Sequence, residues 1–125
     1  MVWKTIKQIR PEILLTGVEL NPIMAESARP YYDELITCPI ENARLATEFD
    51  LINCGDIIEH LQDPWSMLKR LHGLLRNNGY LIMSIPNVGH WSIAKELLKG
   101  NFQYVPLGLL CIAHLRWFSE SSIHQ

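Results

Sequence analysis

The sequence predicts an α/β fold in which a mainly parallel sheet of about four strands is flanked by helices. Four short apolar runs alternate with helix-like stretches, and the runs lie at residues 13–20, 33–38, 49–54 and 80–85. Strands that alternate with helices indicate a parallel sheet, because parallel neighbours need a long crossover connection that is usually helical. Residues 49–87 show the unit best, as a strand, a Gly-Asp turn, a capped helix and a second strand.

The expected helices are marked by capping signals. Residues 2–9 have apolar positions at helical spacing and end near Pro11. Asn21-Pro22 combines a good N-cap with proline at the first helical position, and this helix is expected to end at Pro30. Residues 41–46 suit a single helical turn, residues 91–98 a helix stopped by Gly100, and Ser119 caps a last helix.

Asp63-Pro64 repeats the same helix start before the last strand. The helix that follows presents one apolar stripe, formed by Trp65, Leu68, Leu71, Leu74 and Leu75. The run Asn77-Asn78-Gly79 is expected to end this helix and turn the chain into the strand.

Composition limits the classes of protein. The chain has 125 residues, which suits one domain of about 100–150 residues. Its net charge is -2, without a Lys/Arg run, so nucleic acid and an anionic membrane surface are not the expected partners. The longest apolar run, 107–113, is too short to span a bilayer. Three separated cysteines without a CxxC pair indicate a reducing compartment, so we expect a cytoplasmic protein.

Polar residues follow the expected strands at their carboxyl ends, where open α/β sheets bind ligands. Glu19 ends the first strand, and its two carboxylate oxygens suit the two ribose hydroxyls of a nucleoside, although a solvated loop carboxylate is the plainer interpretation. Cys54, Gly55 and Asp56 follow the third strand, where Gly55 allows close approach of a ligand; an ordinary turn is the alternative.

Four candidate substrate residues and one candidate base lie in later loops. His60 is a candidate general base, against the alternative of a structural, hydrogen-bonded histidine. Asn87 and His90 follow the last strand, and His114 and Arg116 offer a donor and a fixed cation for a polar or anionic substrate, unless all four are simply loop polarity. The histidines show no ligand spacing along the sequence, so no metal site is expected.

Taken together, several segments resemble a class I S-adenosylmethionine-dependent methyltransferase. The resemblance is carried by TGVELNP, PIEN, FDLINCGDIIEHLQDPW, NNGYLIMSIPNVGHW and HLRWFS, in that order. It covers roughly residues 13–119 and is strongest toward MetW-like and glycosyltransferase-associated methyltransferases. The resemblance implies an incomplete Rossmann-like fold with S-adenosylmethionine as cofactor.

The resemblance also implies roles for individual residues. Glu19 would bind the ribose hydroxyls, while Leu20 and Ile40 would contact the adenine. Asn53, Cys54 and Gly55 would line the methionine end of the cofactor. Asp56, Glu59 and His60 would border the reaction centre. The acceptor substrate would be faced by Asn87, His90, His114 and Arg116.

The resemblance further implies that residues 1–125 are a partial, truncated domain. The family's first strand with its GxGxG loop and its last two strands are not found in the sequence, and Pro39 stands where the family usually has an aspartate. Because the first strand belongs in the middle of such a sheet, its loss would leave unpaired edges or force the neighbouring strands together. We therefore expect a homo-oligomer or a strand-exchanged dimer.

Three functional hypotheses follow. The first is methyl transfer to a small-molecule or glycan-type acceptor. The second is a catalytically inactive, truncated remnant or an interaction module. The third is a fragment of a nicotinamide-dependent dehydrogenase, which also uses an acidic residue at a strand end, but the EHLQDPW segment argues against it.

Overall fold

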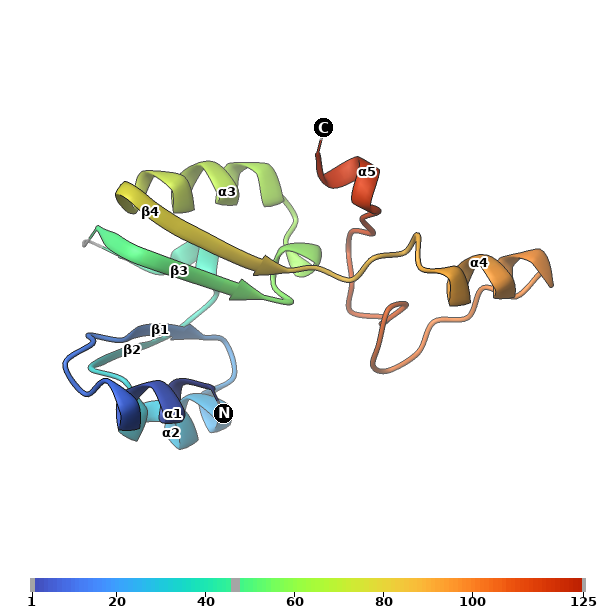
Figure 1. Cartoon of the computed structure of the whole chain (residues 1–125). Coiled ribbons are helices and arrows are strands. Elements are labelled where there is room, and N and C mark those ends of the chain that lie inside the picture. The colour runs from blue at the N-terminus through green and yellow to red at the C-terminus, as the bar shows by residue number, and fades with distance from the viewer. Residues whose placement is uncertain (1, 46–47, 125) are drawn as a thin grey trace. The chain divides into compact units, whose positions relative to one another are not determined.

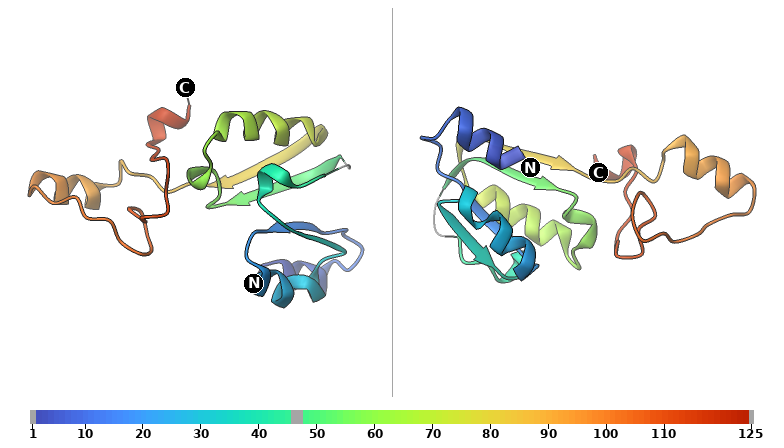
Figure 2. Two further views of the ribbon diagram at one scale, coloured as in Figure 1. Left: turned by 180° about the vertical axis from the view of Figure 1, so that it is seen from behind. Right: turned by 90° about the horizontal axis from the view of Figure 1, so that it is seen from below.

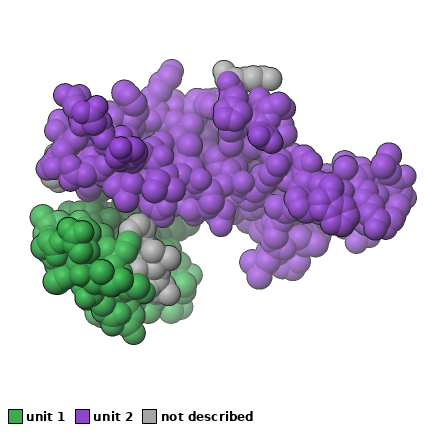
Figure 3. All heavy atoms as spheres, viewed as in Figure 1, with its two compact units in different colours: residues 1–45 green, residues 46–125 purple. Residues whose placement is uncertain are grey.

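A computed structural model describes residues 2–45 and 48–124. The chain forms two compact units, Met1–Leu45 and Ala46–Gln125, which are coloured separately in Figure 3. Each unit contains one two-stranded parallel sheet. The predicted α/β class with parallel strands is therefore confirmed. The expected sheet of about four strands is not seen, because the strands of the described residues form two separate pairs.

The first unit pairs β1 (Thr16–Glu19) with β2 (Glu34–Thr37). The predicted strands at 13–20 and 33–38 are thus present but shorter. Figures 1 and 2 show α1 (Val2–Ile9) and α2 (Pro22–Ala28) on the same face of this sheet. Two 3-10 turns, η1 (Arg29–Tyr31) and η2 (Ile40–Asn42), complete the unit.

Local sequence explains how this unit forms. The side chain of Asn21 accepts hydrogen bonds from the backbone N–H groups of Ile23 (2.9 Å) and Met24 (3.3 Å), which confirms the predicted cap of α2. Gly17 lies under Tyr32: a Cβ at this position would be 2.6 Å from the Tyr32 ring and 2.7 Å from Leu35. Real Cβ atoms do not approach so closely, so only glycine allows these side chains to pack against β1.

Asp33 joins the start of β2 to both β1 and α1. Its carboxylate accepts the backbone N–H of Leu15 at 2.7 Å and lies 2.7 Å from Nζ of Lys7. These two contacts, the Leu15 hydrogen bond first, lower the pKa of Asp33 from its usual value. A lowered pKa in the folded state means that the stabilisation is present above the unfolded-state pKa and is lost as the pH falls through the folded-state pKa.

We therefore expect Asp33→Asn to lower the thermal unfolding midpoint at about pH 7 and to have a much smaller effect at about pH 2. Melting curves of the two proteins across this range test the linkage. A difference in midpoint that stays constant with pH would show that the charge of Asp33 does not stabilise the fold.

The second unit pairs β3 (Phe49–Gly55) with β4 (Leu75–Ser84), and α3 (Pro64–Gly73) covers one face of this sheet (Figure 1). A 3-10 turn, η3 (Ile58–His60), follows β3. Two helices come after the sheet, α4 (Trp91–Leu98) and α5 (Glu120–Ile123). The side chain of Asp63 accepts the N–H of Ser66 at 3.0 Å, so the predicted cap of α3 is confirmed.

The predicted boundary between α3 and β4 is wrong. The helix ends at Gly73, and residues 77–79 lie inside β4 instead of forming a separate turn. The strand is irregular there, because Phe49 pairs with Leu75 but Leu51 pairs with Tyr80. Asn78 has a φ of 66°, a conformation that asparagine tolerates better than most residues. The turn signal in the sequence thus marks a bulge within a strand.

The predicted apolar stripe on α3 is also partly wrong. The residues of α3 that the structure buries are Pro64, Met67 and Leu71, which share one face of the helix. Trp65 is 51% exposed. Periodicity alone selected the stripe that begins at Trp65, whereas the buried face includes Met67 together with Leu71.

The later helices agree with the sequence. The range of α4 is the predicted 91–98, and Gly100 follows it with a φ of 78°. Ser119 caps α5 in a reciprocal capping box with Ser122. The turn predicted at 41–46 is found at Ile40–Asn42, and Ala46 lies outside the described residues. In the part of the chain that the structure describes, no helix is long and apolar enough to cross a membrane.

Candidate functional site

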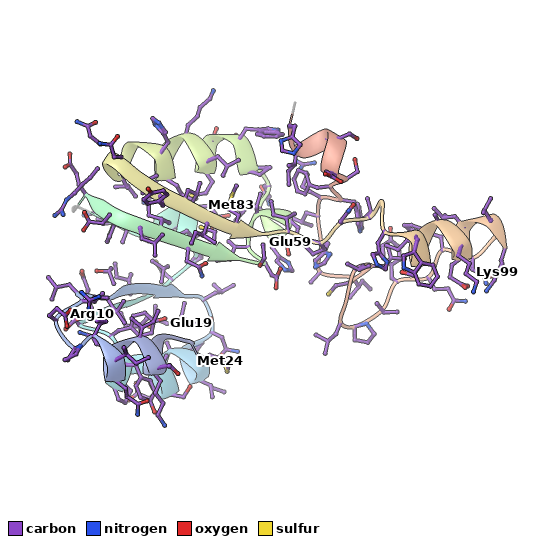
Figure 4. The ribbon with its side chains drawn as sticks, in the orientation of Figure 1. Arg10, Glu19, Met24, Glu59, Met83 and Lys99 are labelled. Atoms are coloured by element: carbon purple, nitrogen blue, oxygen red, sulfur yellow. The ribbon has the colours of Figure 1, made fainter. Side chains whose placement is uncertain are left out.

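The residues predicted to hold a nucleoside lie in the first unit, at the carboxyl end of its sheet. Glu19 ends β1 and is paired with Thr37, the last residue of β2. One carboxylate oxygen of Glu19, Oε1, accepts the backbone N–H of Asn21 at 2.8 Å. Leu20 beside it is 67% exposed, and Ile40 lies in η2 just after β2. Figure 4 labels Glu19 at this end of the sheet.

This arrangement provides a fixed carboxylate next to an uncovered apolar side chain. The hydrogen bond from Asn21 orients the Glu19 carboxylate through Oε1, and Oε2 accepts no hydrogen bond from the described residues. The charge of Glu19 also reaches Tyr32, whose pKa is raised mainly by burial and further by this carboxylate. An acceptor of hydroxyl groups beside an apolar surface suits a ribose and its base.

The second unit presents polar groups at the carboxyl ends of β3 and β4. Asp56 follows β3 with a φ of 51°, so the strained residue of this turn is Asp56 and not Gly55. The hydroxyl of Ser84, the last residue of β4, donates to Asp56 Oδ1 at 3.0 Å. The backbone N–H of Asp56 donates to the carbonyl oxygen of Ser84 at 3.0 Å. These two bonds fix the turn that the sequence predicts to face a ligand.

Two other predicted cofactor residues differ in exposure. Asn53 is exposed on β3, whereas Cys54 is only 5% exposed, with its side chain in the core. Burial raises the pKa of the Cys54 thiol. Cys54 can therefore offer a ligand its backbone but not its sulfur.

A cluster of Glu59, His60 and His114 lies just beyond this turn. Each residue offers one nitrogen or oxygen atom, and these atoms all lie within 4.8 Å of one another. Glu59 is 1% exposed and His114 is 7% exposed, while His60 is exposed. The rings of His60 and His114 meet edge to face, with centroids 4.8 Å apart. Figure 4 shows Glu59 beside the ends of β3 and β4.

Backbone hydrogen bonds bring the two parts of this cluster together. The carbonyl oxygen of Glu59 accepts the N–H groups of Leu115 (2.9 Å) and Arg116 (3.0 Å). Nδ1 of His60 lies 2.9 Å from the carbonyl oxygen of Ala113. Because a carbonyl oxygen only accepts, Nδ1 must carry the hydrogen, and the neutral ring then has its lone pair on Nε2.

The remaining predicted substrate residues are placed differently. The Arg116 guanidinium donates to the carbonyl oxygen of Gln62, so this cation is tied to the loop before α3. Asn87 forms a bridge with Phe118 and lines an open depression together with Gly89, Ser119, Glu120 and Ser121. His90 caps α4 through Nδ1, which accepts the N–H of Ser92 at 3.3 Å. Among the described residues, His90 contacts Ser92 and Trp91 and makes no hydrogen bond to the cluster.

The sequence marks all three residues of the cluster as candidate site residues, but it does not predict that they meet. Glu59 was expected only to border the reaction centre, and His60 and His114 were assigned separate roles. One signal was available: Glu59 stands within the apolar run IIEHL, where a buried acidic residue is unusual. The contact between residues 59–60 and 113–116 depends on long-range hydrogen bonds that no local pattern encodes.

Comparison with known proteins identifies the family. Residues 6–125 match a family model described as a methyltransferase domain. The chain belongs to this methyltransferase-domain family. The predicted resemblance to methyltransferases is confirmed at this level, and membership implies S-adenosylmethionine as the methyl donor.

Individual relatives agree with this assignment. A ubiquinone biosynthesis O-methyltransferase of Histophilus somni is 34% identical over 74 residues, covering 51% of this chain and 31% of the relative. The mitochondrial ubiquinone biosynthesis O-methyltransferase of Schizosaccharomyces pombe is 28% identical over 79 residues, covering 56% and 29%. The tRNA 5-carboxymethoxyuridine methyltransferase of Escherichia coli is 32% identical over 78 residues, covering 61% and 30%. The chain thus spans about a third of each of these relatives.

Proposed function

We propose that this chain takes part in S-adenosylmethionine-dependent methyl transfer to an oxygen of a small-molecule or glycan-type acceptor. Membership of the methyltransferase-domain family and the O-methyltransferases among the relatives support this chemistry. A net charge of -2, without a basic run, favours a small acceptor over nucleic acid. The proposal includes a methyltransferase domain of MetW-like type.

The observation that carries the proposal is the Glu19 carboxylate at the carboxyl end of β1. Its Oε1 is held by the N–H of Asn21, and Leu20 next to it is exposed. These residues would hold the adenosine part of the cofactor, and Ile40 would pack against its base. When bound, the cofactor supplies a methyl group on a sulfonium for in-line displacement.

Roles are proposed separately for residues of the second unit. Asn53, Gly55 and the backbone of Cys54 would line the methionine end of the cofactor, next to the turn that Ser84 holds at Asp56. The exposed His60 would accept the proton of the acceptor hydroxyl at Nε2, because its Nδ1 is engaged with Ala113. The acceptor would also meet Asn87, His90, His114 and Arg116.

We also propose that the protein is cytoplasmic and associates with itself. Cys38, Cys54 and Cys111 are free thiols, which supports a reducing compartment. Within the described ranges, β1 and β3 each have one paired neighbour, so each sheet has strand edges open to further pairing. A purified chain that stays monomeric at high concentration would contradict the proposed homo-oligomer or strand-exchanged dimer.

The proposal is tested by calorimetric titration of S-adenosylhomocysteine into the purified chain and two variants. We expect saturable binding to the wild-type chain and about 10- to 100-fold weaker binding to Glu19→Ala, because a hydrogen-bonded charged acceptor is lost. Glu34→Ala is the matched control. Glu34 lies in the neighbouring strand of the same sheet but at its opposite end, across from Thr16.

The outcomes separate the hypotheses. Binding that Glu34→Ala keeps and Glu19→Ala weakens supports the proposed nucleoside site. Binding that both variants keep would mean that Glu19 is not part of the site. No binding to the wild-type chain would favour the inactive remnant or interaction module.

A further inference from the structure

The Glu59–His60–His114 cluster contains buried polar atoms without partners. Within residues 2–45 and 48–124, both carboxyl oxygens of Glu59 and Nδ1 of His114 are buried and have no hydrogen-bond partner. Glu59 is 1% exposed, which makes it among the most buried side chains of the chain. Buried polar groups in folded proteins are nearly always paired, so several orphaned atoms at one point require an explanation.

Pairing between Glu59 and His114 does not explain these unpartnered atoms. Oε1 of Glu59 lies 3.9 Å from Nε2 of His114, which is too long for a hydrogen bond. Tetrahedral ligands at about 2.0–2.2 Å from a zinc ion lie about 3.3–3.6 Å apart, so these two atoms are within a few tenths of an ångström of the spacing that a shared ion needs. The widest separation in the cluster, 4.8 Å, is larger than this spacing by more than about 1 Å. Binding one ion would therefore require the three side chains to draw closer together.

The surroundings of His60 also match those of a metal ligand. Histidines that bind metals commonly donate their other ring N–H to a backbone carbonyl, which fixes the tautomer and the ring orientation. His60 does so through Nδ1 and the carbonyl oxygen of Ala113, at 2.9 Å. The two backbone hydrogen bonds to the Glu59 carbonyl oxygen hold the segment that contains His114 next to Glu59. The proposed ligands are therefore brought together by hydrogen bonds that do not involve the ligand atoms themselves.

We propose that Glu59, His60 and His114 bind a divalent transition-metal ion of the zinc class. Two imidazoles and one carboxylate suit such an ion, whereas magnesium and calcium prefer oxygen ligands alone. Three protein ligands leave a coordination position open for water or another oxygen ligand. The spacing along the sequence does not reveal this site, because His114 reaches it only through the fold. The proposal does not depend on methyl transfer.

The ion would change the role of His60. With the ion bound, the Nε2 lone pair of His60 is shared with the metal and no longer accepts a proton. An acceptor hydroxyl at the open position would then lose its proton more readily, because a bound cation stabilises the resulting oxyanion.

The test is a titration of zinc chloride into the full chain after removal of metals with a chelator, with calorimetry as the readout. The wild-type chain is expected to bind one ion per chain. His60→Ala is expected to weaken binding by at least about 10-fold. Because His60 is exposed, this variant is expected to fold, which circular dichroism would check. Glu59→Gln and His114→Ala provide second and third tests of the ligand set.

Two controls exclude other ligands. His72→Ala removes an exposed histidine of α3 that lies outside the cluster, and Cys38→Ser removes a partly exposed thiol. Both are expected to bind zinc like the wild-type chain. The proposal is overturned if the wild-type chain shows no saturable binding, if His60→Ala binds as tightly, or if either control abolishes binding.

Discussion

Replacing Leu71 by alanine is expected to lower the free energy of unfolding by about 2–5 kcal/mol. Leu71 is 2% exposed and lies one turn after Met67, which is 5% exposed, on the buried face of α3. The substitution removes apolar contacts and leaves a cavity that the surrounding core fills only in part. Urea unfolding followed by circular dichroism measures the difference.

Leu98→Ala makes the same chemical change at an exposed position. Leu98 is 91% exposed at the end of α4, so its truncation is expected to change the free energy of unfolding by less than about 0.5 kcal/mol. Equal losses in the two variants would mean that the core of the second unit is not centred on Leu71.

Hydrophobic periodicity predicted the helix α3 but only part of its buried face. Helical spacing correctly predicted a helix after Asp63, since an N-cap and proline at the first position act locally. The same spacing gave the buried face only in part, because it grouped the exposed Trp65 with the buried Leu71. Which apolar residues are buried depends on the partner surface, which for α3 includes β4.

The sequence predicted that the strands pair in parallel, but not how many strands each sheet contains. The alternation of strands and helices indicated parallel pairing, and both sheets are parallel. The number of strands in a sheet depends on long-range contacts that the pattern does not contain. Gly79 shows the same limit within one strand: a Cβ there would lie 3.0 Å from the carbonyl oxygens of Arg76 and Phe49. The glycine permits a close backbone approach inside β4, where the sequence suggested a helix stop.

The candidate site was predictable where it follows from strand direction. Glu19, Gly55 and Asp56 were placed at carboxyl ends of strands, and the structure has them there. The meeting of Glu59 with His114 was not predictable, because it depends on backbone bonds between distant segments. Local patterns therefore locate single residues, and the fold decides which of them act together.

Replacing Glu59 by methionine is expected to stabilise the metal-free protein by about 1–3 kcal/mol. Both carboxyl oxygens of Glu59 are buried without a hydrogen-bond partner among the described residues. Such oxygens lose their hydrogen bonds to water on folding and gain none from the protein, which destabilises the fold. Methionine has a similar shape, no polar oxygens and enough flexibility to fill the same space. Thermal unfolding in the presence of a chelator compares the two proteins.

Glu96→Met is the matched control for this change. The Glu96 carboxylate is partly exposed and already paired, with Lys99 at 2.6 Å and Asn101 at 3.0 Å, so its replacement is not expected to stabilise the protein. A destabilised Glu59→Met variant would show that the buried carboxyl group has a partner in solution, and the argument for an ion at this cluster would lose its basis. A stabilised variant that no longer binds zinc would show that Glu59 lowers the stability of the fold while it serves the site, as buried polar residues at functional positions often do.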